Sequence, residues 1–333
     1  MEEIVVHHLF NGGTEAQIQA ANQLAKFSPK QRHKLVEKGI ISPLVLMLQS
    51  QDYRAIEAAL FALLSLAFGS ERNKIRIVKS GIVPVLLELL QCEDETLIEI
   101  VVAALLILSS CSANKLTITS FGAIPLIVGI LGEDGPTCFS MQAKLDALAT
   151  LHNLSTCQQI IPSVVSSGAV LILLQIIHNS YEKSSRLVEK AMALLENITT
   201  LSEDAVLQTA TTGGAIQTLV ENLEEGSPQC KEHASAILLL ICQSCGDEYR
   251  GLILREGVMP GLLQLSVDGT WRAKDTAREL LLLLRDYSGY GSRGKQSKHQ
   301  LIEQIMQQID AEGETVIGTT LKLVEEMIAK LST

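Results

Sequence analysis

Apolar and polar residues follow a helical period along this chain, and the whole pattern returns every forty-odd residues. One phrase recurs six times: a glycine followed by small or branched apolar residues, in most copies with a proline close behind. Its glycines are Gly39, Gly81, Gly122, Gly168, Gly214 and Gly257, so successive copies lie 41 to 46 residues apart. A period of this length is typical of proteins that stack helical units, because one such unit cannot bury its apolar face alone.

Each repeat divides into three predicted helices. A short first helix, such as 73–80, ends at the glycine, where a residue without a side chain permits a sharp turn. The proline that follows falls in the first turn of a second helix, where its missing N–H costs nothing. After a polar break such as 91–95, a long third helix follows, for example over 97–109.

The third helices share one register. A reference position lies 15 to 17 residues before each glycine and continues once beyond the last: Gln23, Ser65, Ile107, Asn153, Asn197, Leu240 and Leu283. Six residues earlier the side chain is mostly small, and the next residue is always Leu or Ile, which indicates a core face. The pattern predicts an all-α fold, a right-handed superhelix of the α-α solenoid kind.

We expect the repeat domain, one partial N-terminal repeat and six repeats, to cover residues 1–287. A Gly, Ser and basic linker over 288–300 and amphipathic helices over 301–333 follow as a short helical C-terminal tail. The tail either caps the stack or docks against a partner, and capping is favoured because solenoid ends need a polar outer face. Two insertions, 132–137 and 178–185, separate second from third helices; they either tune binding or are tolerated surface variation.

Several motifs resemble armadillo (ARM) repeats: the Gly-Ala-Ile-Pro-Leu phrase at 122–126, the Asn-Lys pairs at 73–74 and 114–115, and Asn-Leu-Ser at 153–155. More narrowly, residues 269–281, followed by Leu284-Arg285, resemble the closing repeat of the ARM region of plant U-box (PUB-ARM) proteins. The resemblance covers about residues 14–287. It implies a stack that binds proteins, often ligase targets or receptor kinases, while a separate U-box contacts the ubiquitin-conjugating enzyme. These 333 residues contain no U-box-like stretch, so we expect no ligase activity from them alone.

Composition narrows the partner class and the compartment. The chain has 27 basic and 37 acidic residues and a formal charge of −10, which disfavours nucleic acid, since phosphates require clustered Lys and Arg. Its apolar runs are too short for a membrane span, and its acidic start resembles no secretory signal. Seven cysteines, an odd number scattered in apolar sequence, suit buried thiols in a reducing compartment. We therefore expect a cytoplasmic or nuclear protein.

Acidic residues recur on the third helices, eight positions before the reference position. They are Glu15, Glu57, Glu99, Glu189, Glu232 and Asp275, with Leu145 as the exception. One interpretation is structural: each would lie in the first turn of its helix and meet the positive end of the helix dipole. The other is an acidic stripe along a concave groove, formed by Glu57, Glu99, Glu189 and Glu232, that attracts a basic or extended segment of a protein partner.

Asn153 and Asn197 complete the candidate groove. Each either hydrogen-bonds the backbone of an extended partner or ties neighbouring repeats together, because a buried amide must find partners in both cases. Importin-α-type armadillo proteins carry an asparagine ladder with tryptophans one turn earlier. Here the other reference positions are not Asn and no Trp precedes any of them by one turn, so we expect no nuclear-import receptor.

The sequence offers no catalytic constellation, and we expect no enzyme activity, metal or cofactor. Cys242-x-x-Cys245 has the spacing of half a zinc site but lacks a second pair nearby. The predicted function is a non-enzymatic scaffold or adaptor that binds partner proteins through the ARM groove, and the family resemblance implies a setting in plant signalling or ubiquitin-dependent turnover. The alternative is a target-recruiting subunit of a ubiquitin ligase whose U-box or RING is supplied in trans. The resemblance implies that the partners include ligase components and receptor kinases.

Overall fold

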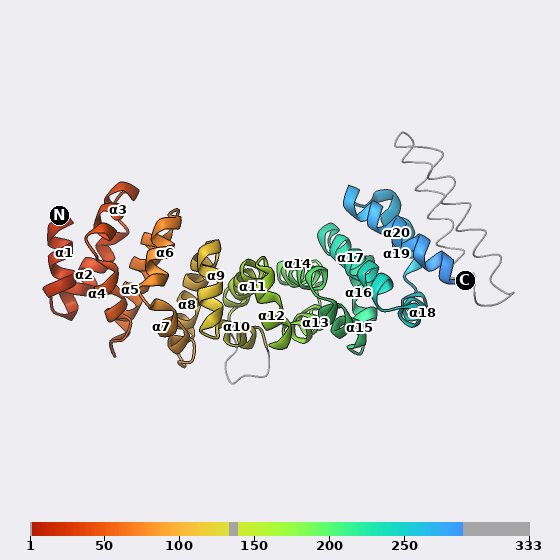
Figure 1. Cartoon of the computed structure of the whole chain (residues 1–333), viewed down its shortest axis with the longest axis horizontal. Coiled ribbons are helices and arrows are strands. Elements are labelled where there is room, and N and C mark those ends of the chain that lie inside the picture. Colours follow the sequence, from red (N-terminus) through yellow and green to blue (C-terminus); the bar gives the residue numbers. More distant parts are fainter. Residues whose placement is uncertain (1, 133–138, 289–333) are drawn as a thin grey trace. The chain divides into compact units, whose positions relative to one another are not determined.

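The structure is a computed structural model that describes residues 2–132 and 139–288, with side chains up to 285. Over these ranges every regular element is a helix, so the predicted all-α repeat fold is confirmed (Figure 1). Residues 133–137 of the first insertion, and Cys138 after it, lie outside the described residues. So do the linker beyond Ser288 and the C-terminal tail.

The helices follow the predicted order of three per repeat. The first helices are α3 (Pro29–Glu37), α6 (Glu71–Lys79), α9 (Lys115–Ser120), α12 (Ile161–Ser166), α15 (Glu203–Thr211) and α18 (Asp247–Arg255), with 3₁₀ turns η1 (Ser112–Asn114) and η2 (Gln158–Ile160) leading into α9 and α12. The second helices are α4 (Ile41–Met47), α7 (Ile82–Leu89), α10 (Ala123–Leu131), α13 (Ala169–Asn179), α16 (Ala215–Glu225) and α19 (Met259–Asp268). The third helices are α2 (Thr14–Leu24), α5 (Tyr53–Ala67), α8 (Glu95–Ser109), α11 (Met141–Ser155), α14 (Arg186–Leu201), α17 (Pro228–Ser244) and α20 (Trp271–Ser288). Helix α1 (Glu2–Asn11) precedes them and packs on α2, which accounts for the partial repeat.

The chain divides into two compact units, Met1–Ser167 and Gly168–Thr333. In the first unit the third helices α2, α5, α8 and α11 pack side by side in that order (Figure 1). In the second unit α14, α17 and α20 do the same. Each unit therefore presents a face made of consecutive third helices, and the predicted domain boundaries stay a prediction.

The repeated glycines make the turns that the sequence predicts. All six have φ between +78° and +84°, the left-handed region that L side chains rarely adopt. At Gly122 a Cβ would meet nothing within 4 Å, so the requirement there is backbone conformation and not space. The residue after each reference position, from Leu24 to Leu284, is at most 2% exposed, which confirms the predicted core register.

The Asn-Lys pairs of the first unit form hydrogen bonds within their repeat and to the next one. Asn73 and Asn114 are each 2% exposed, and their amide groups donate to carbonyls that end the preceding third helices, at 2.8 Å to Leu66 O and 3.1 Å to Leu108 O. The neighbouring lysines reach the end of the next third helix, Lys74 to Ser110 Oγ at 2.8 Å and Lys115 to Thr156 Oγ1. Each pair thus closes one repeat and fastens it to the next.

Candidate partner-binding site

The periodic acidic residues lie on one face of the third helices, but not all in the first turn. Glu15 and Glu189 do lie in the first turns of α2 and α14. Glu57, Glu99 and Glu232 are each the fifth residue of their helix, as is Asp275 in α20. The expectation that all of them meet the helix dipole in the first turn is therefore wrong for these four, since the dipole's effect fades within that turn.

Glu57 and Glu99, both in the first unit, keep their carboxylates available. Glu57 is exposed on α5 and Glu99 is half-buried on α8. Within the described part of the chain neither carboxylate forms a hydrogen bond or an ion pair. The corresponding carboxylate of α2, Glu15, lies 3.4 Å from Arg54 Nη2 and is 62% exposed, so it is only weakly engaged.

Glu189 and Glu232, in the second unit, are bonded to the start of the next third helix. Ser227 is the N-cap of α17: its hydroxyl accepts from Cys230 N at 3.2 Å and donates to Glu189 Oε1 at 2.8 Å. One repeat later Thr270 Oγ1 donates to Glu232 Oε2 at 2.5 Å. These two carboxylates connect successive repeats through the hydroxyl groups that begin the helices.

A buried carboxylate that sequence reasoning missed organises the same face. Glu196 of α14 has a side chain only 9% exposed, and it contacts His233 Nδ1 of α17 at 2.5 Å through Oε2 and Arg272 Nη2 of α20 through Oε1. Arg272 also donates to Glu232 Oε1 at 3.0 Å. Burial alone would raise the pKa of Glu196, but the hydrogen bond from His233 and the charge of Arg272 outweigh it and lower that pKa. These residues join three consecutive third helices.

No local sequence pattern predicts this network. Glu196 and Arg272 are 76 residues apart, and only the stacking of two further repeats brings them together. Arg272 does belong to the 269–281 motif that resembles the closing PUB-ARM repeat. An alignment of the repeats could have predicted the contact from two features. One is the basic residue at 272, and the other is the carboxylate at 196, just before the reference position two repeats earlier.

The two asparagines have different surroundings. Asn153 of α11 is half-buried, and its amide donates to Ser109 Oγ at 3.2 Å and Leu106 O at 3.4 Å, both on α8. That geometry ties neighbouring repeats, the second of the two roles considered for it. Asn197 is half-buried on α14 and also interacts within the chain. Their contact with a partner stays a prediction.

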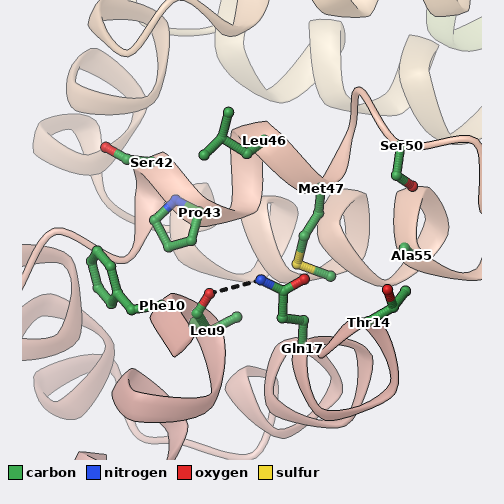
Figure 2. A pocket seen from close by; sticks show the side chains of 10 residues that line it. All are labelled: Leu9, Phe10, Thr14, Gln17, Ser42, Pro43, Leu46, Met47, Ser50 and Ala55. Carbon is green, nitrogen blue, oxygen red and sulfur yellow. Dashed lines mark hydrogen bonds between the residues drawn. The ribbon is translucent and has the colours of Figure 1, made fainter. Parts of the chain in front are cut away.

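A separate hollow of about 260 Å³ lies at the N-terminal end of the first unit (Figure 2). Side chains from α1, α2, α4 and the start of α5 surround it, with Phe10, Pro43 and Leu46 on one side and Gln17 and Met47 on the other. Gln17 Nε2 donates to Leu9 O at 3.0 Å and so closes the end of α1. The lining is mainly apolar, and Phe10 and Leu46 are 49% and 67% exposed.

The cysteine pair does not form an activated site. Burial raises the pKa of Cys242 to about 12, so its thiol stays protonated at neutral pH. Among the described residues no three His, Cys, Asp or Glu side chains are placed to hold one metal ion. No single described helix is long and apolar enough to cross a membrane, although two bent pairs of helices meet that length and composition together.

The chain is an armadillo repeat protein by its architecture: each repeat has three helices, a glycine in the left-handed backbone conformation separates the first helix from the second, and the third helices lie side by side. Solved structures agree at the level of fold. An engineered protein superposes with a TM-score of 0.75 at 20% identity over 98% of this chain and 78% of its own. A designed armadillo repeat protein in complex with the peptide (KR)4 gives a TM-score of 0.60 at 19% identity, over 73% of this chain and 99% of its own.

Sequence families make the assignment narrower. Residues 70–110 match the armadillo/β-catenin-like repeat, and residues 139–327, more than half of the chain, match the plant U-box protein ARM repeat region. The chain belongs to this plant U-box ARM repeat family. It is 31% identical over 182 residues to U-box domain-containing protein 45 of Arabidopsis thaliana and 32% identical over 140 residues to U-box domain-containing protein 17. These matches cover 54% and 42% of the chain but only 22% and 18% of the relatives, so the chain spans about a fifth of their length.

Proposed function

We propose that this chain is a non-catalytic protein-interaction scaffold whose third-helix faces bind segments of partner proteins in plant signalling or ubiquitin-dependent turnover. The observation that carries the proposal is the match of residues 139–327 to the ARM region of plant U-box proteins. The repeated third-helix face supplies the surface, since helical repeat arrays present extended surfaces of this kind to their partners. The complex of a designed armadillo repeat protein with (KR)4 is an example of a peptide bound by such a stack.

The surface residues proposed to meet a partner are Glu57, Glu99, Asn153, Asn197, Glu189 and Glu232. They differ in availability. Among the described residues Glu57 and Glu99 have no bonding partner, whereas Glu189 and Glu232 already accept hydrogen bonds from helix caps. A partner that engages the latter two has to share or displace these bonds, so the first unit offers the more accessible acidic contacts.

A second candidate function follows from the relatives that the chain matches. Both are U-box proteins, and the chain corresponds to their ARM region. In this role the chain recruits targets for a ubiquitin ligase whose U-box or RING is supplied by another polypeptide. The two candidates share the binding surface and differ in what happens to the bound protein.

Affinity purification from plant extract tests the first candidate. The bait is compared with the charge-reversed variant E57K/E99K and with E203K/D204K, which reverses two exposed acids at the start of α15. We expect one set of partners to be lost with E57K/E99K and retained with the control. Identical recovery with wild type, with E57K/E99K and with E189K/E232K, which alters α14 and α17, would contradict the proposal.

A ubiquitination assay separates the two candidates. The chain is incubated with activating and conjugating enzymes, first alone and then with each recovered partner. We expect no transfer by the chain alone. Transfer that requires both the chain and a recovered U-box or RING partner would favour the recruiting role, and transfer by the chain alone would overturn the non-catalytic assignment.

A further inference from the structure

An exposed apolar surface lies on the third-helix face of the first unit. It consists of Phe61, Leu64 and Phe68 from α5 and its C-terminal cap, and of Ile100, Leu106 and Ile107 from α8; we name it the α5–α8 strip. Phe61 and Phe68 are 49% and 76% exposed, and the other four side chains are half-buried. Spacings of three, four and seven residues place the α5 side chains on one stripe, and the seven-residue spacing of Ile100 and Ile107 does the same on α8, with Leu106 beside Ile107.

The strip is continuous because α5 and α8 pack directly against each other. Phe61 replaces the small side chain that α8, α11, α14 and α17 carry one turn before the reference position, where each has Ala. Neighbouring apolar side chains that remain exposed in a folded protein are typical of interaction sites. The corresponding face of the second unit is different, since Glu196, His233 and Arg272 fill it with mutually bonded polar groups.

Carboxylates that have no bond to any described residue flank the strip at one end. Glu57 precedes Phe61 by one turn of α5, and Glu99 precedes Ile107 by two turns of α8. Neither is bonded within the described residues, and the nearest basic group on α5, Arg54, lies 3.4 Å from Glu15. The strip therefore joins apolar surface to unneutralised negative charge.

Resting on the proposed function, we propose that the α5–α8 strip binds a partner segment in which bulky apolar side chains lie next to lysine or arginine. The apolar side chains cover Phe61 and Phe68, and the basic ones reach Glu57 and Glu99. Charge complementarity selects this partner. A purely apolar partner would cover two carboxylates without compensation, which is costly, and a second copy of the strip or an anionic lipid surface would bring negative charge to negative charge.

Fluorescence anisotropy with the full chain and a labelled peptide tests the proposal. The probe is Lys-Lys-Ser-Phe-Ser-Leu-Ser, whose two apolar side chains point the same way in an extended chain, beside a basic end. One control peptide has Ser in place of Phe and Leu, and the other has Glu in place of both Lys. We expect the probe to bind about tenfold tighter than either control peptide.

Matched protein variants locate the binding site. F61S/F68S should weaken probe binding about tenfold, whereas F121S, which alters a 50% exposed phenylalanine at the end of α9, should not. E57Q/E99Q should weaken binding about threefold and flatten its dependence on salt, whereas E203Q/D204N should not. F68S alone removes the most exposed of the strip's side chains and serves if the double variant fails to fold.

Three results would overturn the proposal: equal affinity for all peptides, equal loss with F61S/F68S and F121S, or no detectable binding of the probe at millimolar concentration. The proposed function fails differently, because partner recovery from plant extract would then be insensitive to substitutions on every third helix. Partners that depend on α14 or α17 but not on the strip would leave the proposed function standing and reject this inference.

Discussion

Replacement of Glu196 by glutamine tests whether the buried network stabilises the second unit. The substitution keeps the side chain's shape but removes its negative charge, so Arg272 retains only Glu232 and His233 loses its carboxylate acceptor. Removal of one partner from a fully buried ion pair costs about 3–5 kcal/mol, and an exposed pair contributes about 0–1 kcal/mol. Glu196 is 9% exposed and Arg272 is 44% exposed, an intermediate case, so we expect a loss of about 2 kcal/mol.

Hydrogen exchange is the appropriate assay, because repeat arrays do not always unfold as one cooperative unit. A loss of about 2 kcal/mol corresponds to about 30-fold faster exchange of protected amides. The acceleration should be concentrated in α14, α17 and α20. The control is E182Q, which alters an exposed glutamate in the loop before α14. It should leave exchange in these three helices nearly unchanged.

The loss of stability caused by E196Q should become smaller as the pH falls. Because the folded protein holds the pKa of Glu196 below its ordinary value of 4.5, the carboxylate's contribution to stability is complete above pH 4.5. It decreases as the pH falls through the lower, folded-state pKa. The titratable and charged groups bonded to Glu196 are His233 and Arg272, and Arg272 also bonds to Glu232. A variant that exchanges like wild type at neutral pH, or whose deficit grows on acidification, would refute this account.

Three further substitutions or measurements test the fold. G122A places a side chain at φ +81° and should cost about 1–2 kcal/mol in thermal or denaturant unfolding, whereas G129A, within α10, should stabilise by about 0.5–1 kcal/mol; equal effects would exclude backbone conformation as the cause. N114A removes the buried amide that donates to Leu108 O and leaves that carbonyl only backbone donors such as Cys111 N at 3.4 Å; it should cost about 1 kcal/mol in the same assay, while N22A, on the exposed side of α2, should cost nothing, and equal losses would contradict a capping role. Cys242 should resist iodoacetamide in the native protein at pH 8 and react after denaturation, as mass spectrometry would show; rapid native labelling would contradict its burial and its pKa of about 12.

The repeat pattern was enough to predict the fold because the physics that builds it is local. A glycine at φ of +78° or more ends each first helix, a proline lies in the first turn of most second helices, and a fixed register buries the same positions in all seven third helices. Each of these follows from a residue type at a position within a single repeat. The prediction therefore succeeded where one repeat contains the whole cause, as it does for Gly81 or Leu108.

The candidate site was harder to predict because its interactions cross repeats. Glu189 and Glu99 occupy the same repeat position, yet only Glu189 meets a hydroxyl group of the next helix. The partner of Glu196 lies 76 residues away, beyond the range of any periodic pattern. Exposure of Phe61 likewise depends on how neighbouring third helices surround it, which a single helix cannot indicate.

The identity of the next helix's N-cap explains part of this difference. Ser227 and Thr270 carry hydroxyl groups that can donate to the carboxylate of the preceding repeat, and both do so. The N-cap that follows Glu57 is Asp94, whose carboxylate accepts a hydrogen bond from Leu97 N at 2.9 Å and has no proton to offer Glu57. An acidic cap thus has no donor for the preceding glutamate, whereas a hydroxyl cap can supply one. A hydroxyl is not sufficient by itself, since Ser140 caps α11 and forms no hydrogen bond with Glu99.

The effect of the cap on Glu57 can be tested by exchanging Asp94. D94S keeps a good N-cap, since Ser and Asp cap helices about equally well, and gives Glu57 the hydroxyl donor that Glu189 and Glu232 already have. We expect stability within about 0.5 kcal/mol of wild type or slightly above it, together with weaker binding of the basic–apolar probe to the α5–α8 strip. D52S, which changes the cap one repeat earlier, is the matched control, because Glu57 lies after that cap and gains no donor from it. Equal loss of probe affinity in both variants would trace the effect to net charge and reject the cap as the device that keeps Glu57 available.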